Sequence, residues 1–85
     1  MKDWTVYLLK CSDDTYYCGS TNNLDRRIHA HNMGRGAKYT NGRRPVELLS
    51  YRSELTQTQA LQLEYQVKRQ AKARKIHYLN NKSID

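Results

Sequence analysis

Four side chains within the first 31 residues have types and spacings that could perform chemistry. Tyr7 and Tyr17 lie in two short strand-like segments, and Arg27 and His31 follow within a dozen residues of the second segment. Arginine presents a planar, permanently charged fork to a phosphate group, and histidine can transfer a proton near neutral pH. Two phenols, a guanidinium and an imidazole so close together are more typical of a phosphodiester-cleaving site than of side-chain packing.

Each of these side chains also has an ordinary structural interpretation. Tyr7 and Tyr17 can fill a small core, as most lone strand tyrosines do. Arg27 and its neighbour Arg26 can form the solvated basic face of a helix, with His31 near the negative end of the helix dipole. The local pattern leaves both interpretations of Arg27 and His31 open.

Glu64 lies on or beside the apolar stripe of a helix expected in the second half of the chain. Its neighbours on the helix surface are Ala60, Leu61 and Val67. An ionised carboxylate there is costly unless a cation or hydrogen-bond donors compensate it. One interpretation is a ligand for a hard divalent ion, with water and phosphate oxygens completing the coordination. The other, favoured by spacing alone, is an i,i+4 ion pair with Lys68.

Cations, glycines and one aromatic ring alternate in residues 33–45. The cations are Arg35, Lys38, Arg43 and Arg44, and the ring is Tyr39. Such a segment can contact a nucleic-acid backbone and stack one base, and its glycines allow close approach of a strand. We expect a nucleic-acid surface here, without an indication of sequence preference.

The net charge of +7 is unevenly distributed along the chain. Residues 1–25 carry −2, residues 26–52 carry +6 and residues 53–85 carry +3. This imbalance favours a polyanionic partner, of which nucleic acid is the usual one. Solubility is the simpler alternative explanation of the charge.

The 85 residues indicate a single domain, residues 1–85, with a core over about residues 4–75 and a polar tail over about residues 80–85. No apolar run is long enough for a membrane span and no leader opens the chain, so we expect a cytoplasmic protein with no membrane partner. Cys11 and Cys18 lack metal-ligand spacing, so we expect two reduced thiols.

A β-hairpin is expected from the strand-like residues 4–9 and 16–20 and the turn-forming residues between them. Opposed residues of an antiparallel pair share a face. A three-residue loop at residues 12–14 would oppose Tyr7 to Gly19 and place both tyrosines on one face. A two-residue loop would separate the tyrosines, and the sequence does not decide between the two.

The remaining elements are predicted from capping residues and periodicity. A helix over residues 24–32 follows a cap at Asn22 or Asn23 and ends at Gly34. One helical turn near residues 37–40, a third strand over 46–51, a helix from a capping box at Thr56 to about Lys72 and a possible final short helix follow. We therefore expect an α+β sandwich, in which helices flank a small three-stranded antiparallel sheet in the order β-β-α-β-α.

In this order and spacing the sequence resembles the GIY-YIG nuclease superfamily, in particular its small single-domain bacterial members, with a catalytic domain like that of excision-repair endonucleases. Thr5-Val6-Tyr7 stands where the family has Gly-Ile-Tyr, and Tyr17-Cys18-Gly19 stands where it has Tyr-Ile-Gly. Arg27 has the spacing of the family's catalytic arginine. His31 takes the place of a tyrosine or histidine, and Glu64 lies on the helix that carries the metal-binding glutamate.

The resemblance extends from residue 6 to about residue 75, and residues 31–40 and 43–48 closely match the small bacterial subfamily. Two departures stand out. Thr5 replaces the glycine of the first motif, and the family's C-terminal asparagine would align near Ile76, with Asn80 as a distant candidate. These departures make a catalytically weak or inactive nucleic-acid-binding module the alternative function. A purely basic structural or ribosome-associated protein is a third possibility.

The resemblance implies a nuclease that hydrolyses phosphodiester bonds, with DNA favoured over RNA as the substrate, and with one Mg²⁺ or Mn²⁺ ion at Glu64. Arg27 would hold a non-bridging phosphate oxygen while a water attacks in line. Tyr7 would take the proton of that water, directly or through His31, and Tyr17 would orient water or phosphate. A free phenol has a pKa of about 10, so either Arg27 and the metal lower it or His31 is the base.

Low intrinsic sequence specificity is expected, because the targeting domain of larger family members is missing. A protein partner could supply specificity, and DNA repair, recombination or processing would be the setting. Outside the reaction centre, the residues expected to contact nucleic acid are Arg26, Arg35, Lys38, Tyr39, Arg43, Arg44 and Lys68.

Overall fold

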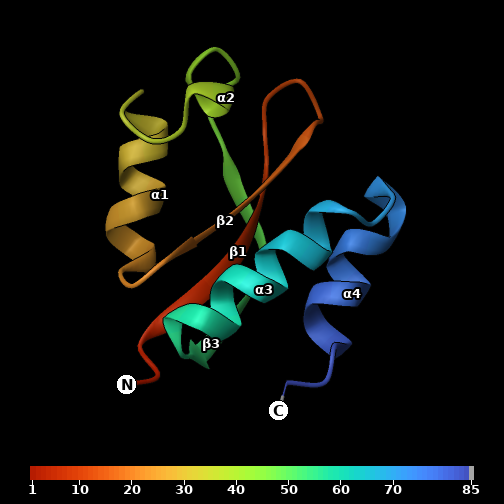
Figure 1. The fold of residues 1–85 in the computed structure, drawn as a ribbon. Coiled ribbons are helices and arrows are strands. Elements are labelled where there is room, and N and C mark those ends of the chain that lie inside the picture. The colour runs from red at the N-terminus through yellow and green to blue at the C-terminus, as the bar shows by residue number, and fades with distance from the viewer. Residues whose placement is uncertain (85) are drawn as a thin grey trace.

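A computed structural model describes residues 1–84, which form a three-stranded antiparallel sheet with helices on both faces (Figure 1). The strands, in spatial order β2-β1-β3, are β1 (Trp4–Lys10), β2 (Tyr16–Thr21) and β3 (Glu47–Leu55). The helical elements are α1 (Leu24–Asn32), α2 (Lys38–Asn41), α3 (Gln57–Lys68), the 3-10 turn η1 (Lys72–Arg74) and α4 (Lys75–Asn81). The predicted α+β class is confirmed, and α4 is the predicted final short helix.

The hairpin adopts the three-residue loop. Tyr7 pairs with Gly19, and Leu9 pairs with Tyr17. The loop closes through a 2.8 Å hydrogen bond from the Cys11 N–H to the Thr15 carbonyl, and Asp14 takes a left-handed conformation with φ of 67°. Loops of this length commonly end in such a residue. The two tyrosines therefore lie on the same face of the sheet.

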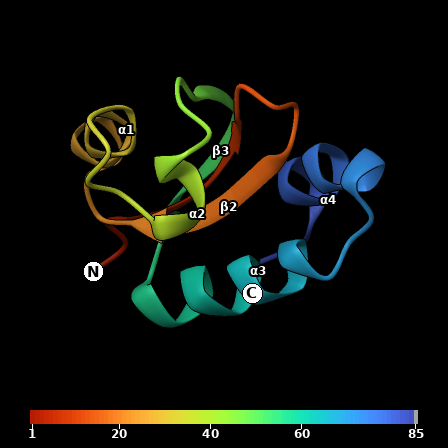
Figure 2. The same cartoon turned by 90° about the horizontal axis from the view of Figure 1, so that it is seen from above.

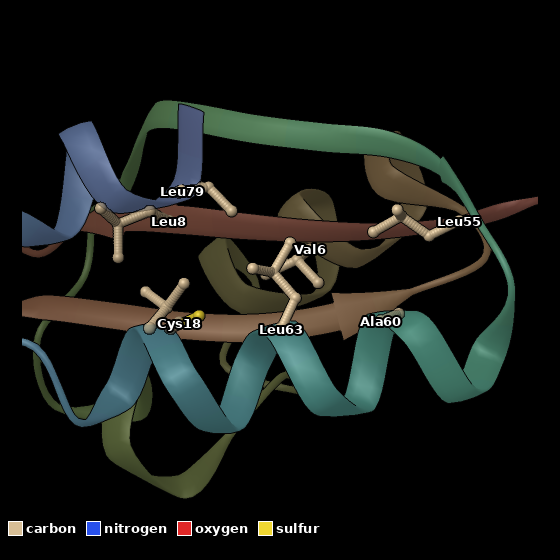
Figure 3. Packing of buried hydrophobic residues seen from close by; sticks show 8 residues of the cluster. Val6, Leu8, Cys18, Leu55, Ala60, Leu63 and Leu79 are labelled. Carbon is tan, nitrogen blue, oxygen red and sulfur yellow. The ribbon is translucent and has the colours of Figure 1, made fainter. Parts of the chain in front are cut away.

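The side chains on the two faces of the central strand β1 pack into two separate apolar clusters. Val6 and Leu8 pack with Leu63 of α3 and Leu79 of α4, all of them buried (Figure 3). Tyr7 and Leu9, on the opposite face, pack with residues of α1. Burying one such aliphatic side chain contributes about 1.5–3 kcal/mol. The sheet thus separates α1 from α3 and α4, as seen from above in Figure 2.

Helix α1 has the bounds that the capping residues predict. The Asn23 side chain accepts a hydrogen bond from the Arg26 N–H at 3.2 Å, which satisfies a free donor of the first turn. Gly34, with φ of +79°, follows the helix in the left-handed conformation that glycine adopts without strain. The cap and the glycine therefore fix where helix α1 begins and ends.

The prediction for the second half of the chain is wrong at two boundaries. Strand β3 extends to Leu55, which lies opposite Trp4, because pairing with the full length of β1 keeps it extended. Helix α3 ends at Lys68 rather than near Lys72. The Lys75 ammonium donates to the carbonyls of Val67 and Lys68, at 3.1 Å each, which satisfies free acceptors at the end of that helix.

The apolar core reaches beyond residue 75, the limit expected from the sequence. Leu79 of α4 is fully buried, and Ile84 packs against the same cluster. Cys11 and Cys18 are free thiols, as expected, and both are buried. Burial raises the pKa of the Cys18 thiol to about 12. Of the helices in residues 1–84, none has the length and hydropathy to cross a membrane.

Candidate active site

The candidate catalytic residues gather around β2, which is an edge strand with β1 as its one neighbour. Alternate residues of a strand point to opposite faces. Tyr17 packs with the α1-side cluster, whereas Ser20 reaches Glu64 of α3 on the other face. Burial is the main cause that raises the pKa of Tyr7 and of Tyr17, and the charge of Glu64 adds a smaller rise to each phenol. The two halves of the site therefore meet around this strand.

The glycine opposite Tyr7 makes room for the phenol. A Cβ atom on Gly19 would lie 2.5 Å from Tyr7 Oη and 2.6 Å from Cζ. Tyr7 is fully buried, and its hydroxyl lies 2.8 Å from Nε2 of His31. The ring of Tyr17 is 6.4 Å from that of Tyr7 and 5.2 Å from that of His31. The register of the hairpin thus brings three of the predicted residues into one aromatic cluster.

His31 is also fully buried and is held from its second nitrogen by the segment around α2. The Nδ1 atom lies 2.8 Å from Thr40 Oγ1, and the Thr40 hydroxyl donates to the Ala37 carbonyl at 3.0 Å. A Cβ atom on Gly36 would clash with the imidazole, so glycine permits this close approach.

These contacts indicate which His31 nitrogen carries the proton. Because the Thr40 hydroxyl proton points to Ala37, the Thr40 oxygen accepts from Nδ1–H, and Nε2 accepts from the Tyr7 hydroxyl. The Ala37 N–H lies 3.3 Å from Nδ1 and favours the opposite tautomer. We assign the proton to Nδ1 because the two contacts that support it are shorter, and such assignments rest on the hydrogen-bond network.

Burial keeps both partners of the Tyr7–His31 pair neutral at neutral pH. Burial raises the pKa of Tyr7 to about 12 and outweighs hydrogen bonding from Arg27, which lowers it. Burial, and secondly the charge of Arg27, lowers the pKa of His31. Arg27 by itself therefore does not convert the phenol into a base, and the neutral imidazole is the proton acceptor available to it.

Arg27 projects from α1 as a half-buried cation. Its Nε atom is buried and has no hydrogen-bond partner, and within residues 1–84 no carboxylate pairs with it. The side chain lines a hollow of about 350 Å³ together with Arg26 and the turn before α1. A buried unpaired donor is costly, so this guanidinium is poised for an anion.

Glu64 is held from two sides. Its Oε1 atom accepts from Ser20 Oγ at 2.7 Å, and its Oε2 atom lies 2.7 Å from the Lys68 ammonium. The ion pair that the helical spacing favours is therefore formed, and hydrogen bonding to Glu64 raises the pKa of Lys68. The Glu64 side chain is 17% exposed, so the carboxylate also remains within reach of solvent.

The chemistry of this carboxylate fits a magnesium or manganese ion. Within residues 1–84, no three His, Cys, Asp or Glu side chains gather into a metal-binding group. Glu64 would thus be the one charged protein ligand, and water and phosphate oxygens would complete the coordination. Magnesium is usually bound in this way, through one or two carboxylates together with waters and substrate phosphates.

A model of the GIY-YIG catalytic domain matches residues 3–77 of the chain. The chain belongs to the GIY-YIG catalytic-domain family. Within it, the chain also belongs to the UPF0213 family of small bacterial proteins, which includes several closely related sequences. One from Clostridium perfringens is 46% identical over 79 residues, covering 93% of this chain and 85% of that protein. One from Bacillus subtilis is 45% identical over 76 residues, covering 89% and 77%.

Two solved structures resemble this member of the GIY-YIG family. The solution NMR structure of a UPF0213 protein from Bacillus halodurans is 38% identical, with a TM-score of 0.56, covering 93% of this chain and 84% of the other. A solution NMR structure of a protein from E. faecalis is 32% identical, with a TM-score of 0.62, covering 94% and 88%. The family expected from the motifs is therefore confirmed.

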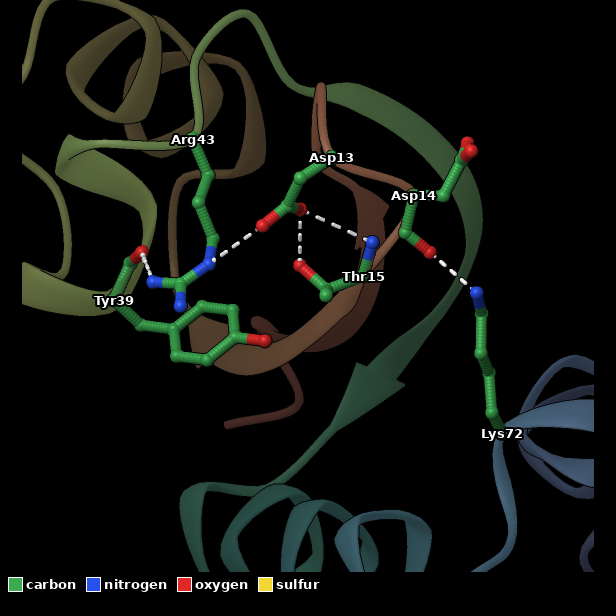
Figure 4. Close-up of polar contacts among 6 residues, drawn as sticks. All are labelled: Asp13, Asp14, Thr15, Tyr39, Arg43 and Lys72. Atoms are coloured by element: carbon green, nitrogen blue, oxygen red, sulfur yellow. Dashed lines mark hydrogen bonds and ion pairs between the residues drawn. The ribbon is translucent and has the colours of Figure 1, made fainter.

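Tyr39 and Arg43, around α2, make contacts within the protein, and Figure 4 shows Arg43 bound to Asp13 and to the Tyr39 carbonyl. The ring of Tyr39 stacks on Tyr17 with centroids 5.9 Å apart, and the Arg43 guanidinium lies 4.1 Å from the centroid of Tyr39. Arg43 also pairs with Asp13 of the hairpin at 2.9 Å and donates to the Tyr39 carbonyl at 2.8 Å. Tyr39 and Arg43 are thus partly committed to contacts within the protein.

The other cations expected to contact nucleic acid differ in how many contacts they make within the protein. Arg44 donates to the Asn41 carbonyl at 2.9 Å and lies 3.5 Å from the Asn32 carbonyl. Arg26, Arg35 and Lys38 are exposed and make no side-chain hydrogen bond or ion pair with the described part of the chain. These last three are therefore the freest of the predicted cations.

Two residues of the candidate site were not identified from the sequence, and one of the sequence candidates lies elsewhere. Ser20 and Thr40 carry no signal in the sequence alone, because each acts through a partner distant along the chain. Asn80 hydrogen bonds to Ser50 of β3, at the opposite edge of the sheet from β2. Asn80 therefore lies at the edge of the sheet opposite the strand that carries Ser20.

Proposed function

We propose that this protein is a metal-dependent nuclease that hydrolyses phosphodiester bonds in DNA with low intrinsic sequence specificity. The observation that carries the proposal is the buried hydrogen bond between Tyr7 and His31, beside Arg27, whose buried Nε has no hydrogen-bond partner, and across β2 from Glu64. The family match supports a nucleic-acid substrate. Repair, recombination or processing of DNA are the settings in which such an activity would serve.

The protein's own residues would perform three tasks in the reaction. Arg27 would bind a non-bridging phosphate oxygen, where negative charge grows as the water oxygen bonds to phosphorus and the leaving oxygen departs. Tyr7 would take a proton from the attacking water and pass its own proton to Nε2 of His31. Tyr17, which stacks on Tyr39 and packs at a tilt against His31, would position the water or phosphate.

Glu64 would hold one Mg²⁺ or Mn²⁺ ion, and Ser20 would keep the carboxylate oriented. When bound, such an ion supplies positive charge that stabilises the developing charge and the leaving oxygen. Around the centre, we propose that Arg26, Arg35, Lys38, Tyr39, Arg43, Arg44 and Lys68 contact the nucleic acid. The three cations without internal partners, Arg26, Arg35 and Lys38, would contribute most to those contacts.

A specific observation favours a second candidate function, a nucleic-acid-binding module without turnover. Tyr7 and His31 are both fully covered by protein, and the Lys68 ammonium occupies one oxygen of Glu64. A protein that lost cleavage could keep the basic surface and this packing. The two candidates differ in whether a metal-dependent product is formed.

Cleavage of end-labelled single-stranded and duplex DNA, with Mg²⁺, Mn²⁺ or EDTA, tests the proposal. Wild type is compared with Glu64→Gln, which keeps the size of the side chain and removes its charge, and with Glu54→Gln, which removes an exposed glutamate near the end of β3. We expect metal-dependent cleavage by wild type and Glu54→Gln, and none by Glu64→Gln. Binding without cleavage by all three proteins would establish the binding module instead.

A further inference from the structure

The carboxylate of Glu64 already forms an ion pair within the protein. The Lys68 ammonium lies 2.7 Å from Oε2, and the Ser20 hydroxyl donates to Oε1 at 2.7 Å. A divalent ion at Glu64 would approach a carboxylate whose charge is already balanced. A metal ion that binds Glu64 must therefore displace one of these two occupants of the carboxylate, Lys68 or Ser20, or share an oxygen with it.

The two occupants differ in how easily they can move. Ser20 belongs to strand β2, whose backbone is paired with β1. The Lys68 side chain is 52% exposed and lies in the last turn of α3, at the end of a flexible four-carbon stem. Ion pairs between side chains at positions i and i+4 of a helix contribute little to stability. Lys68 is therefore the occupant that a second cation would displace.

A displaced Lys68 has a place to go on the same side of the site. It lines a pocket of about 270 Å³ with Tyr17 of β2, Tyr39 of α2 and Lys75 of α4. The Lys75 ammonium is already bound to two carbonyl groups of α3. Lys68 is thus the cation at this pocket free to turn toward a phosphate group near Tyr17.

We propose that Lys68 is a mobile internal counter-ion of Glu64, which a divalent metal ion displaces from the carboxylate and which then binds a phosphate of the nucleic acid. This inference rests on the proposed function, because it takes Glu64 as the metal ligand. Metal binding frees the lysine for a phosphate and so strengthens the binding of nucleic acid, and because the coupling is reciprocal, nucleic acid strengthens metal binding by the same factor. The metal ion is held weakly until a phosphate of the substrate binds the Lys68 ammonium.

The experiment measures the affinity for Mn²⁺ in the absence of nucleic acid, from the electron paramagnetic resonance signal of the free ion. The proteins compared are wild type, Lys68→Gln, Glu64→Gln and the control Lys82→Gln, which removes the same charge from the C-terminal segment. Thermal melting checks that each variant is folded. We expect Lys68→Gln to bind Mn²⁺ roughly fivefold to tenfold more tightly than wild type, within the usual range of coupling between sites, and Lys82→Gln to match wild type.

The outcomes separate this inference from the proposed function. Equal Mn²⁺ affinity of wild type and Lys68→Gln, or weaker binding by Lys68→Gln, would overturn the counter-ion role while Glu64 remained the ligand, provided that Glu64→Gln loses binding. Equal affinities of wild type and Glu64→Gln would overturn the metal site itself and the inference with it. A gain in Lys82→Gln as large as that in Lys68→Gln would assign the effect to net charge and overturn the specific role of Lys68.

Discussion

The Tyr7 hydroxyl and Nε2 of His31 lie 2.8 Å apart in a part of the molecule where neither side chain is exposed. Tyr7 comes from the central strand and His31 from the last turn of α1, 24 residues later. Burial raises the pKa of the phenol and lowers that of the imidazole. The pair is thus neutral, and its hydrogen bond offers a route by which a proton can leave Tyr7.

Arg27→Ala should abolish most of the cleavage while weakening binding only modestly. In the proposed reaction the guanidinium stabilises charge that develops in the transition state, so its loss should lower the cleavage rate by about 10²–10³-fold. The proposal assigns binding to several other cations as well, so the affinity should fall only a few-fold. Single-turnover cleavage and a fluorescence-anisotropy titration measure the two effects separately. Full activity in this variant would remove Arg27 from the mechanism.

Thr40→Val should lower activity without removing any group that touches the substrate, because Thr40 positions His31. The Thr40 oxygen accepts from Nδ1–H at 2.8 Å and thereby keeps Nε2 free for the Tyr7 proton. We expect a fall in the cleavage rate of about tenfold to a hundredfold, the range found for groups that hold a metal-ligating side chain in its orientation.

The conservative variant Thr40→Ser keeps the hydroxyl and should restore most of the lost activity. The pH–rate profile is the decisive measurement, since loss of the Nδ1 contact should shift the limb that His31 controls. If Thr40→Val and Thr40→Ser had the same profile as wild type, Thr40 would be a packing residue only.

Gly19→Ala should destabilise the protein, because its Cβ atom would lie 2.5 Å from Tyr7 Oη. Forcing extra volume into a packed site costs about 1–3 kcal/mol of the free energy of unfolding. Gly42→Ala is the matched control, since its Cβ atom would meet nothing within 4 Å. Urea denaturation measures both variants. Equal midpoints would mean that Tyr7 moves aside without cost.

Stability should decrease as the pH falls below about 6.5. The pKa of His31 is lowered from 6.5 in the folded protein, because burial and then Arg27 disfavour the charged ring. Below pH 6.5 the unfolded chain therefore takes up a proton that the folded protein does not. The free energy of unfolding therefore decreases as the pH falls from 6.5 to the pKa of His31 in the folded protein. The decrease is at most about 1.4 kcal/mol per pH unit.

Urea denaturation between pH 8 and pH 5 measures this loss, with wild type compared with His31→Gln, His29→Gln and His77→Gln. The slope between pH 6.5 and pH 5 should shrink only in His31→Gln. A slope that persists in that variant would assign the pH dependence to other groups.

The sequence predicted correctly the ends of those helices that residues close by in the chain determine. Asn23 and Gly34 set the two ends of α1, because a capping side chain and a left-handed residue act within one turn of the helix. The sequence by itself also determined the order of Tyr7, Tyr17, Arg27, His31 and Glu64, whose spacing identifies the family. It did not place the end of α3, which depends on Lys75 folding back from α4.

Only the tertiary structure decided how those residues stand toward one another. The register that opposes Tyr7 to Gly19 depends on pairing across the hairpin, which the turn residues allowed in two forms. Burial, which sets the protonation of Tyr7 and His31, arises from the packing of α1 and α2 over the sheet. The contacts of Ser20 with Glu64 and of Thr40 with His31 join residues from separate elements. Such contacts exist only once the chain has folded, because they depend on distances in space rather than along the sequence.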